Sequence, residues 1–145
     1  MTPPLPHPFT ALAFDYGLRR LGIAVGQSLT GTASPVTVLR MRDGAPDWPA
    51  IAALLATWEP DVLVVGLPLN MDGSEQPLTA RARGFARRLR GRFGLPVHEW
   101  DERLTSREAR ERLDAAGRTR AADDAVAAEV ILESWLGAHR PAAGS

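Results

Sequence analysis

The stretch FTALAFDYGLRRLGIAVGQ, residues 9–27, decides the fold that the sequence predicts. Residues 9–16 form a short apolar run that ends in a carboxylate, a pattern typical of a buried strand. Gly17 and two arginines form a turn, and residues 21–27 read as a second strand with glycines where the backbone is closely approached. Two strands joined by so short a turn predict an antiparallel hairpin.

The rest of the chain continues with a third strand and then alternates between helix and strand patterns. After a turn rich in Thr and Gly (28–34), strands are expected at 35–39, 61–66 and 97–101. Helices are expected at 48–58 with Asp47 as N-cap, from Ser74 to about Phe93, from Thr105 to about Ala116, and, after a loop at 117–122, at 124–136. This order predicts an α/β domain whose five-stranded mixed sheet begins with three antiparallel strands, continues with parallel crossovers, and is flanked by helices.

The composition is that of one globular domain. With 145 residues, 45% of them hydrophobic, the chain can build one core, and no apolar run approaches the roughly 20 residues of a membrane span. Residues 1–8, which include four prolines, and residues 138–145 are expected to be disordered tails around a domain at 9–137. No signal peptide is apparent, and the absence of cysteine excludes disulfides, zinc thiolates and thiol catalysis. A cytoplasmic protein without membrane contact is expected.

The charges are unevenly distributed although the net charge is zero. Residues 81–120 carry 12 Arg against 6 acidic residues, whereas residues 1–80 carry 4 against 7 and residues 121–145 carry 1 against 4. The expected long helix alone has six Arg and no acidic residue between positions 81 and 92. An amphipathic helix with a solvated face is the plainer interpretation, but neighbouring like charges repel, and a bound polyanion would relieve the repulsion.

Three acidic residues stand where expected elements begin or end. Asp15 closes the first strand, Glu102 follows the fifth, and Asp124 opens the last helix. Carboxylates that a fold can bring together, without Cys or clustered His, indicate a site for a hard cation such as Mg²⁺ or Mn²⁺, which acts on phosphates. The sequence therefore predicts a metal-dependent nuclease with Asp15, Glu102 and Asp124 as its catalytic and metal-binding residues.

Each of these carboxylates has a plainer alternative. Asp15 could cap the turn that follows it. Asp101 and Glu102 are adjacent and face opposite sides of a strand, so only one enters the site, and Glu102, at the strand's end, is preferred. Asp124 could be an N-cap or first-turn acid of its helix, with Asp123 as the competing ligand. One apolar helical stripe nevertheless continues from Asp124 through Ala128, Ile131 and Trp135.

With these residues assembled, the chain resembles the YqgF family, also called RuvX, over residues 10–137. The resemblance is carried by ALAFDYGLRRLGIAV (11–25), VVGLPLNMDGSEQP (64–77), DERLTS (101–106) and DDAVAAEVILESWL (123–136). It implies an RNase H-like fold and assigns the acidic site to Asp15, Glu102 and Asp124. Together with the charge pattern, it suggests substrate contacts from Arg20, Asn70, Ser74, Arg81, Arg88, Arg103, Arg118 and Arg120.

The resemblance implies a bacterial nuclease that matures the 5′ end of pre-16S rRNA during ribosome biogenesis, with RNA as partner. A nuclease for Holliday junctions or other branched or single-stranded DNA is an alternative. So is a non-catalytic, nucleic-acid-binding ribosome-assembly factor. An actin-like ATPase is disfavoured, because that fold needs two such domains around its nucleotide. Either a monomer or a homodimer is compatible with the sequence.

Overall fold

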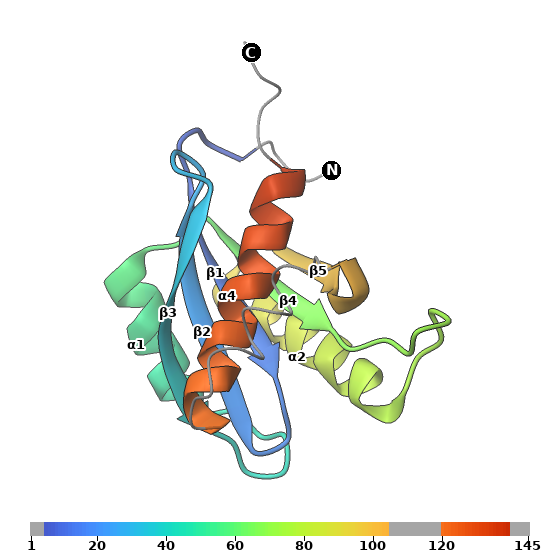
Figure 1. The fold of residues 1–145 in the computed structure, drawn as a ribbon. Helices are drawn as coiled ribbons and strands as arrows, with labels where there is room; N and C mark the ends of the chain where they lie inside the picture. Colours follow the sequence, from blue (N-terminus) through green and yellow to red (C-terminus); the bar gives the residue numbers. More distant parts are fainter. Residues whose placement is uncertain (1–4, 105–119, 140–145) are drawn as a thin grey trace.

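The computed structural model describes residues 5–104 and 120–139, the first four of the latter by their backbone alone (Figure 1). The helix expected between Thr105 and Ala116, and most of both expected tails, lie outside the described residues. The elements in chain order are β1 (Thr10–Tyr16), β2 (Arg20–Gln27), β3 (Thr32–Arg40), α1 (Trp48–Trp58), β4 (Val62–Leu67), α2 (Pro77–Phe93), β5 (Val97–Asp101), the 3₁₀ turn η1 (Glu102–Leu104) and α4 (Arg120–Ala138).

The five strands form one mixed sheet in the order β3-β2-β1-β4-β5. Strands β1, β2 and β3 are antiparallel neighbours, whereas β4 pairs in parallel with both β1 and β5. The predicted α/β class, the strand count and the change from antiparallel to parallel pairing are confirmed. Strands β1, β4 and β5 therefore end at the same edge of the sheet.

Helices cover both faces of this sheet (Figure 1). Alternation along β1 sends Leu12 and Phe14 into a core shared with α1 and α2, and sends Ala11 and Ala13 toward α4. Small residues dominate the α4 side of the central strands, so α4 lies close to the sheet, and Trp135 is fully buried there. Any side chain on that face of β1 and beyond Ala13 is thus directed toward the N-terminal half of α4.

The edge strand β3 is longer than predicted, because it begins at Thr32 instead of Pro35. The turn is correspondingly shorter. Pro35 lies within the strand, opposite Ala24, at a register shift that leaves one extra residue on β3. Proline has no N–H to donate and is tolerated in sheets mainly on edge strands and at bulges. The proline therefore marks a bulge inside β3 and not the start of the strand.

Two helix starts also differ from the prediction, whereas α1 begins after Asp47 as expected. Helix α2 begins at Pro77, and its N-cap is Gln76, whose main-chain N–H donates to the Thr79 hydroxyl at 3.1 Å. The predicted cap, Ser74, instead donates its hydroxyl to a carboxylate in the preceding loop. Proline at the first helical position explains the later start.

Helix α4 begins at Arg120, four residues before the predicted start. The sequence predicts a loop for the segment Arg120–Ala122, but arginine and alanine are strong helix formers and extend the helix. Asp124 consequently lies in the second turn of α4, and neither it nor Asp123 is the N-cap.

Within the described ranges, no helix combines the length and the apolar character that crossing a bilayer requires.

Candidate active site

Asp15 is the last residue but one of β1 and faces α4. Its cross-strand partner is Gly22 of β2. Burial raises the pKa of the Asp15 carboxyl well above its usual value, and the negative charges of Glu102 and Asp124 raise it further. Such a group takes up a proton or a cation more readily than a solvated aspartate.

Glu102 opens the turn η1 immediately after β5 and reaches Asp15 at the same edge of the sheet, where the parallel strands end. Hydrogen bonding between the two carboxyl side chains raises the pKa of Asp15 further. Burial raises the pKa of Glu102, although the hydrogen bonding with Asp15 lowers it. Gly66 of β4 makes room for this pair, because a Cβ there would lie 2.7 Å from Glu102 Oε1.

The neighbouring carboxylate, Asp101, has a different partner. Its side chain accepts hydrogen bonds from the main-chain N–H of Arg103 at 2.8 Å and from Arg103 Nη2 at 2.7 Å. These contacts with Arg103 lower the pKa of Asp101. The structure thus brings Glu102, and not Asp101, to Asp15, as strand alternation predicts.

Asp124 approaches the same region from α4. Its main-chain carbonyl lies directly over Gly22, so closely that any Cβ on Gly22 would collide with it. Its carboxylate lies 3.8 Å from Arg20 Nη1 and is close enough to Asp15 to raise that residue's pKa. Asp124 thus lies in the second turn of α4 and not in the predicted first turn, but its side chain is directed toward Asp15 as predicted. The side chain of the competing candidate, Asp123, is not described.

The chemistry of this donor set fits a hard divalent cation. The three side chains offer only carboxylate oxygens, the ligands that Mg²⁺ and Mn²⁺ prefer. Burial and the neighbouring carboxylates raise the pKa of Asp15, and a divalent ion would compensate the negative charges gathered there. Among the described residues, however, no three acidic or imidazole side chains converge on a single point as they stand.

The predicted substrate-binding arginines divide between the two faces of the sheet. Arg20 lines a cavity of about 350 Å³ together with Asp15, Asp124 and the β1–β2 turn. Arg81 and Arg88 lie on α2, which packs on the opposite face, where they line a separate cavity. The Arg81 guanidinium donates there to a main-chain carbonyl at 3.0 Å. Only Arg20 of these three is next to the carboxyl pair.

The remaining predicted contacts lie in or near the loop after β4. Asn70 Nδ2 donates to Ser74 Oγ at 3.0 Å, and Arg103 Nη1 donates to a carbonyl of the same loop at 3.2 Å. The loop is therefore tied to the turn that carries Glu102. Arg118 lies outside the described residues, and Arg120 is described only by its backbone at the start of α4.

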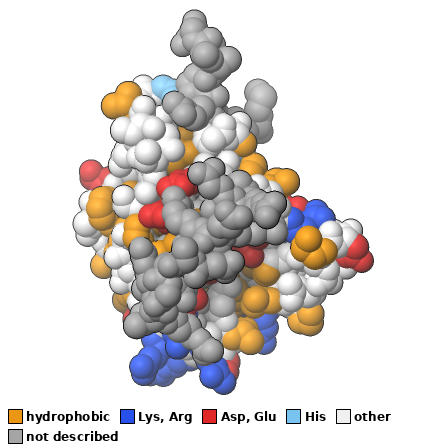
Figure 2. Space-filling view, viewed as in Figure 1, with side chains coloured by type: hydrophobic (Ala, Val, Ile, Leu, Met, Phe, Trp, Pro, Cys, Tyr) orange, Lys and Arg blue, Asp and Glu red, His pale blue; other side chains and the backbone are white. Residues whose placement is uncertain are grey.

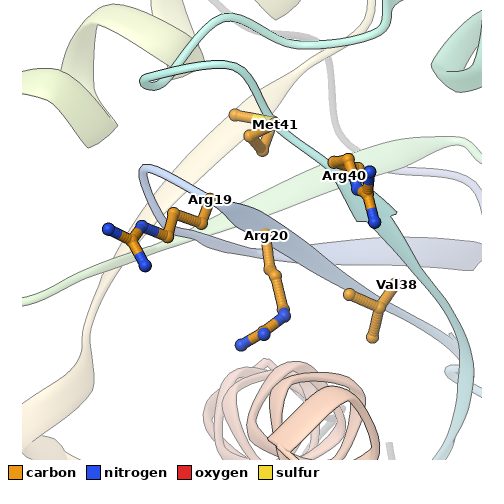
Figure 3. A pocket seen from close by; sticks show the side chains of 5 residues that line it. All are labelled: Arg19, Arg20, Val38, Arg40 and Met41. Carbon is orange, nitrogen blue, oxygen red and sulfur yellow. The ribbon is translucent and has the colours of Figure 1, made fainter.

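Two residues beside the site were not among the predicted ones. Arg19 and Arg40 join Arg20, Val38 and Met41 in lining a cavity of about 420 Å³ (Figure 3). The only signal for them in the sequence is the register of the second and third strands, which depends on the bulge at Pro35. That pairing sets Arg20 opposite Arg40, and the turn sets Arg19 beside them.

The sheet order, the helices on both faces and the carboxyl groups at one edge of the sheet define an RNase H-like α/β protein. Residues 9–138 match the model of the RuvX family, described as Holliday junction resolvase, and the chain belongs to this family.

Curated relatives and solved structures agree with this assignment. Proteins named "Putative pre-16S rRNA nuclease" are 54% identical over 131 residues in Pectobacterium carotovorum subsp. carotovorum (strain PC1) and 55% identical over 134 residues in Edwardsiella ictaluri (strain 93-146). These alignments cover 88% and 90% of this chain, and 94% and 96% of the relatives.

Among solved structures, the fowlpox virus resolvase with Holliday junction DNA has a TM-score of 0.57 at 12% identity, covering 89% of this chain and 97% of that one. Thermus thermophilus RuvC with a Holliday junction substrate has a TM-score of 0.54 at 17% identity, covering 90% and 96%. At these identities the likeness shows the fold.

Proposed function

We propose that this chain is a divalent-metal-dependent nuclease that hydrolyses phosphodiester bonds in the cytoplasm, with precursor 16S rRNA as its substrate and 5′-end maturation as its role. The observation that carries the proposal is the gathering of the Asp15, Glu102 and Asp124 side chains at one edge of the sheet, where Asp15 and Asp124 line one cavity. Membership of the RuvX family and the names of relatives at about 55% identity support the substrate.

In this proposal Asp15, Glu102 and Asp124 hold Mg²⁺ or Mn²⁺. The bound metal would activate the attacking water and neutralise charge that develops on the phosphate. Arg20, which lies 3.8 Å from the Asp124 carboxylate, binds a phosphate oxygen and keeps the backbone against the carboxyl groups. The proposed contacts farther out are Asn70, Ser74, Arg81, Arg88, Arg103, Arg118 and Arg120.

Cleavage of labelled RNA by two neutralised variants tests the proposal. Asp15→Asn should abolish cleavage of a 5′-labelled pre-16S fragment in Mg²⁺ or Mn²⁺, while folding and RNA binding persist. Asp101→Asn is the matched control, since that carboxylate pairs with Arg103 and is not among the groups that shift the pKa of Asp15. Equal turnover by the wild type and Asp15→Asn would refute the proposal. Salt-sensitive binding without turnover of any RNA or DNA would instead favour a non-catalytic assembly factor.

A second candidate substrate is a four-way DNA junction. It is favoured by the description of the family model as a Holliday junction resolvase. Symmetric cutting of a junction requires two active sites related by a two-fold axis, and hence a dimer. Incubation with a labelled junction beside the RNA, together with a solution mass measurement, separates the two substrates. A monomer that cuts only the RNA would exclude the junction.

A further inference from the structure

Two arginines face each other directly across the β2–β3 pair. Arg20 is the first residue of β2 and Arg40 the last of β3, and the register pairs them. Residues paired directly across two strands share one face of the sheet, and here it is the face that α4 covers. Like charges in this position repel and weaken the sheet. The arrangement is therefore costly to the free protein.

A third guanidinium belongs to the same cluster. The carbonyl of Arg19 accepts a hydrogen bond from the main-chain N–H of Met41 at 2.8 Å, which joins the β1–β2 turn to the end of β3. Arg19, Arg20 and Arg40 line the cavity of about 420 Å³ together with Val38 and Met41. Figure 3 shows Arg20 directed toward α4, Arg40 alongside it, and Arg19 extending outward from the turn.

The described part of the chain offers little negative charge to this cavity, which has no acidic residue among its lining. The contact of Arg20 with Asp124, at 3.8 Å, is long for an ion pair. For Arg19 and Arg40, no ion pair or side-chain hydrogen bond is found within residues 5–104 and 124–139.

The arginines of α2 differ in this respect, since several are engaged within the protein. Arg83 Nε lies 2.8 Å from the carboxylate of Glu75, and Arg90 Nη2 donates to the carbonyl of Val97 at 2.8 Å. Arg92 lies 4.2 Å above the ring of Trp48. Part of the arginine-rich segment of α2 therefore stabilises the protein itself, on the face of the sheet opposite Asp15.

We propose that the cavity of Arg19, Arg20 and Arg40 binds the sugar–phosphate backbone of the nucleic acid, at phosphates next to the one that is cut. Guanidinium groups match phosphate oxygens in a bidentate manner, and bound phosphates would remove the repulsion between Arg20 and Arg40. This assignment rests on the proposed nuclease function, because it extends the same site.

The location of the cavity indicates the path that the bound sugar–phosphate backbone would take across the protein surface. The cavity shares Arg19 and Arg20 with the one that contains Asp15 and Asp124, so the two are continuous. Strand β3 lies two strands from β1, about 10 Å at the usual strand spacing. Arg40 also lines the next cavity, of about 380 Å³, with Arg42. Figure 2 shows arginine side chains gathered at this lower end of the molecule.

Salt-dependent binding tests the proposal. The affinity of the full chain for a fluorescent single-stranded RNA and for a four-way DNA junction is measured in EDTA from 50 to 300 mM salt, so that nothing is cleaved. Arg40→Gln and Arg19→Gln should each bind several-fold more weakly. Each should also lower the slope of log affinity against log salt by about 0.7 on RNA or about 0.9 on DNA. Arg92→Gln, which removes the same charge on the opposite face, should leave the slope unchanged.

Thermal unfolding supplies a second measurement, in which the substitution that weakens binding should stabilise the free protein. Arg40→Gln should raise the melting temperature of the free protein by about 1–3 °C, because it removes the cross-strand repulsion with Arg20. Weaker binding, a smaller slope and a higher melting temperature together support nucleic-acid binding in the cavity of Arg19, Arg20 and Arg40, which is called the groove below. A slope equal to that of the wild type on both nucleic acids overturns it, whatever the melting temperature.

The binding and cleavage experiments test the two proposals separately. If the wild type cleaves RNA but the Arg40→Gln slope is unchanged, the groove is wrong and the nuclease stands. If the slope falls while no nucleic acid is cut in Mg²⁺ or Mn²⁺, the groove stands as a binding site and the nuclease proposal fails. A reduced slope on only one of the two nucleic acids supports the groove and identifies its ligand.

Discussion

Gly22→Ala tests the contact that places Asp124 beside the carboxyl pair. Gly22 lies opposite Asp15 on the neighbouring strand, and a methyl group there would collide with the carbonyl oxygen of Asp124 and crowd the Ala125 nitrogen at 3.2 Å. Both obstacles are backbone atoms, which cannot move by a change of rotamer. The substitution must therefore displace the N-terminal half of α4 from the sheet.

The expected cost follows from two opposing terms. Overpacking a close contact costs about 1–3 kcal/mol, and a backbone collision belongs at the upper end of that range. Replacing glycine by alanine restricts the unfolded chain and returns about 0.4–1 kcal/mol. The free energy of unfolding should fall by about 2 kcal/mol, equivalent to a decrease of about 4–8 °C in melting temperature for a chain of this size.

Gly26→Ala is the matched control, on the same strand and the same face. Its methyl group would lie 2.8 Å from Leu136 Cδ1 and 2.9 Å from Leu132 Cδ2, the ends of side chains that can adjust. The remaining strain should roughly cancel the gain from the unfolded state, which leaves stability within about 1 kcal/mol of the wild type. Cleavage should persist in this variant.

Urea unfolding and RNA cleavage together decide the matter. In Gly22→Ala the displaced Asp124 should lower the cleavage rate by about 10²-fold even where the protein is fully folded. Equal stability losses in both variants, or a Gly22→Ala protein as stable and active as the wild type, would refute this account of the helix–sheet contact.

Three further outcomes are expected. EDTA should abolish cleavage and Mg²⁺ or Mn²⁺ restore it in a gel assay, whereas activity that survives exhaustive chelation would contradict the metal site. Tyr16→Phe removes the donor to the buried carbonyl of Gly44 at 2.8 Å and should lower the free energy of unfolding by about 1–3 kcal/mol in urea titrations, with no change in its denaturant slope. Burial, with help from His139 and Arg90, lowers the pKa of His98 below its ordinary value of 6.5. The folded state then binds fewer protons than the unfolded one, so stability should fall as the pH drops below about 6.5, and His98→Gln should flatten that dependence in thermal melts. Identical pH profiles for the two proteins would show that His98 is not the group responsible.

The sequence was most informative where hydrophobic pattern and turn chemistry agreed. The hairpin of β1 and β2, the cap of α1 at Asp47 and the end of α2 at Gly94 follow from such local signals. Strand alternation predicts that the adjacent residues Asp101 and Glu102 face opposite sides of the sheet. In the structure Glu102 lies beside Asp15, whereas Asp101 pairs with Arg103.

Prediction was weakest where a residue can play two local roles. Ser74 looks like a helix cap, but a loop aspartate takes its hydroxyl, and Pro77 starts the helix instead. Asp124 resembles a helix-capping acid until the preceding arginine and alanines extend the helix by one turn. The cluster of Arg19 and Arg40 requires the exact β2–β3 register, which the bulge at Pro35 obscures in the sequence.

The bulge in β3 also bears on how two copies of this chain could associate. Among the described strands, β3 forms one border of the sheet, and an unprotected border strand can pair with another chain by main-chain hydrogen bonds. Pro35 withholds one donor, and the extra residue beside it increases the local twist, so β3 is a poor template for such an extension. Self-association through this border is disfavoured, and Arg40 at its end stays accessible to a nucleic acid.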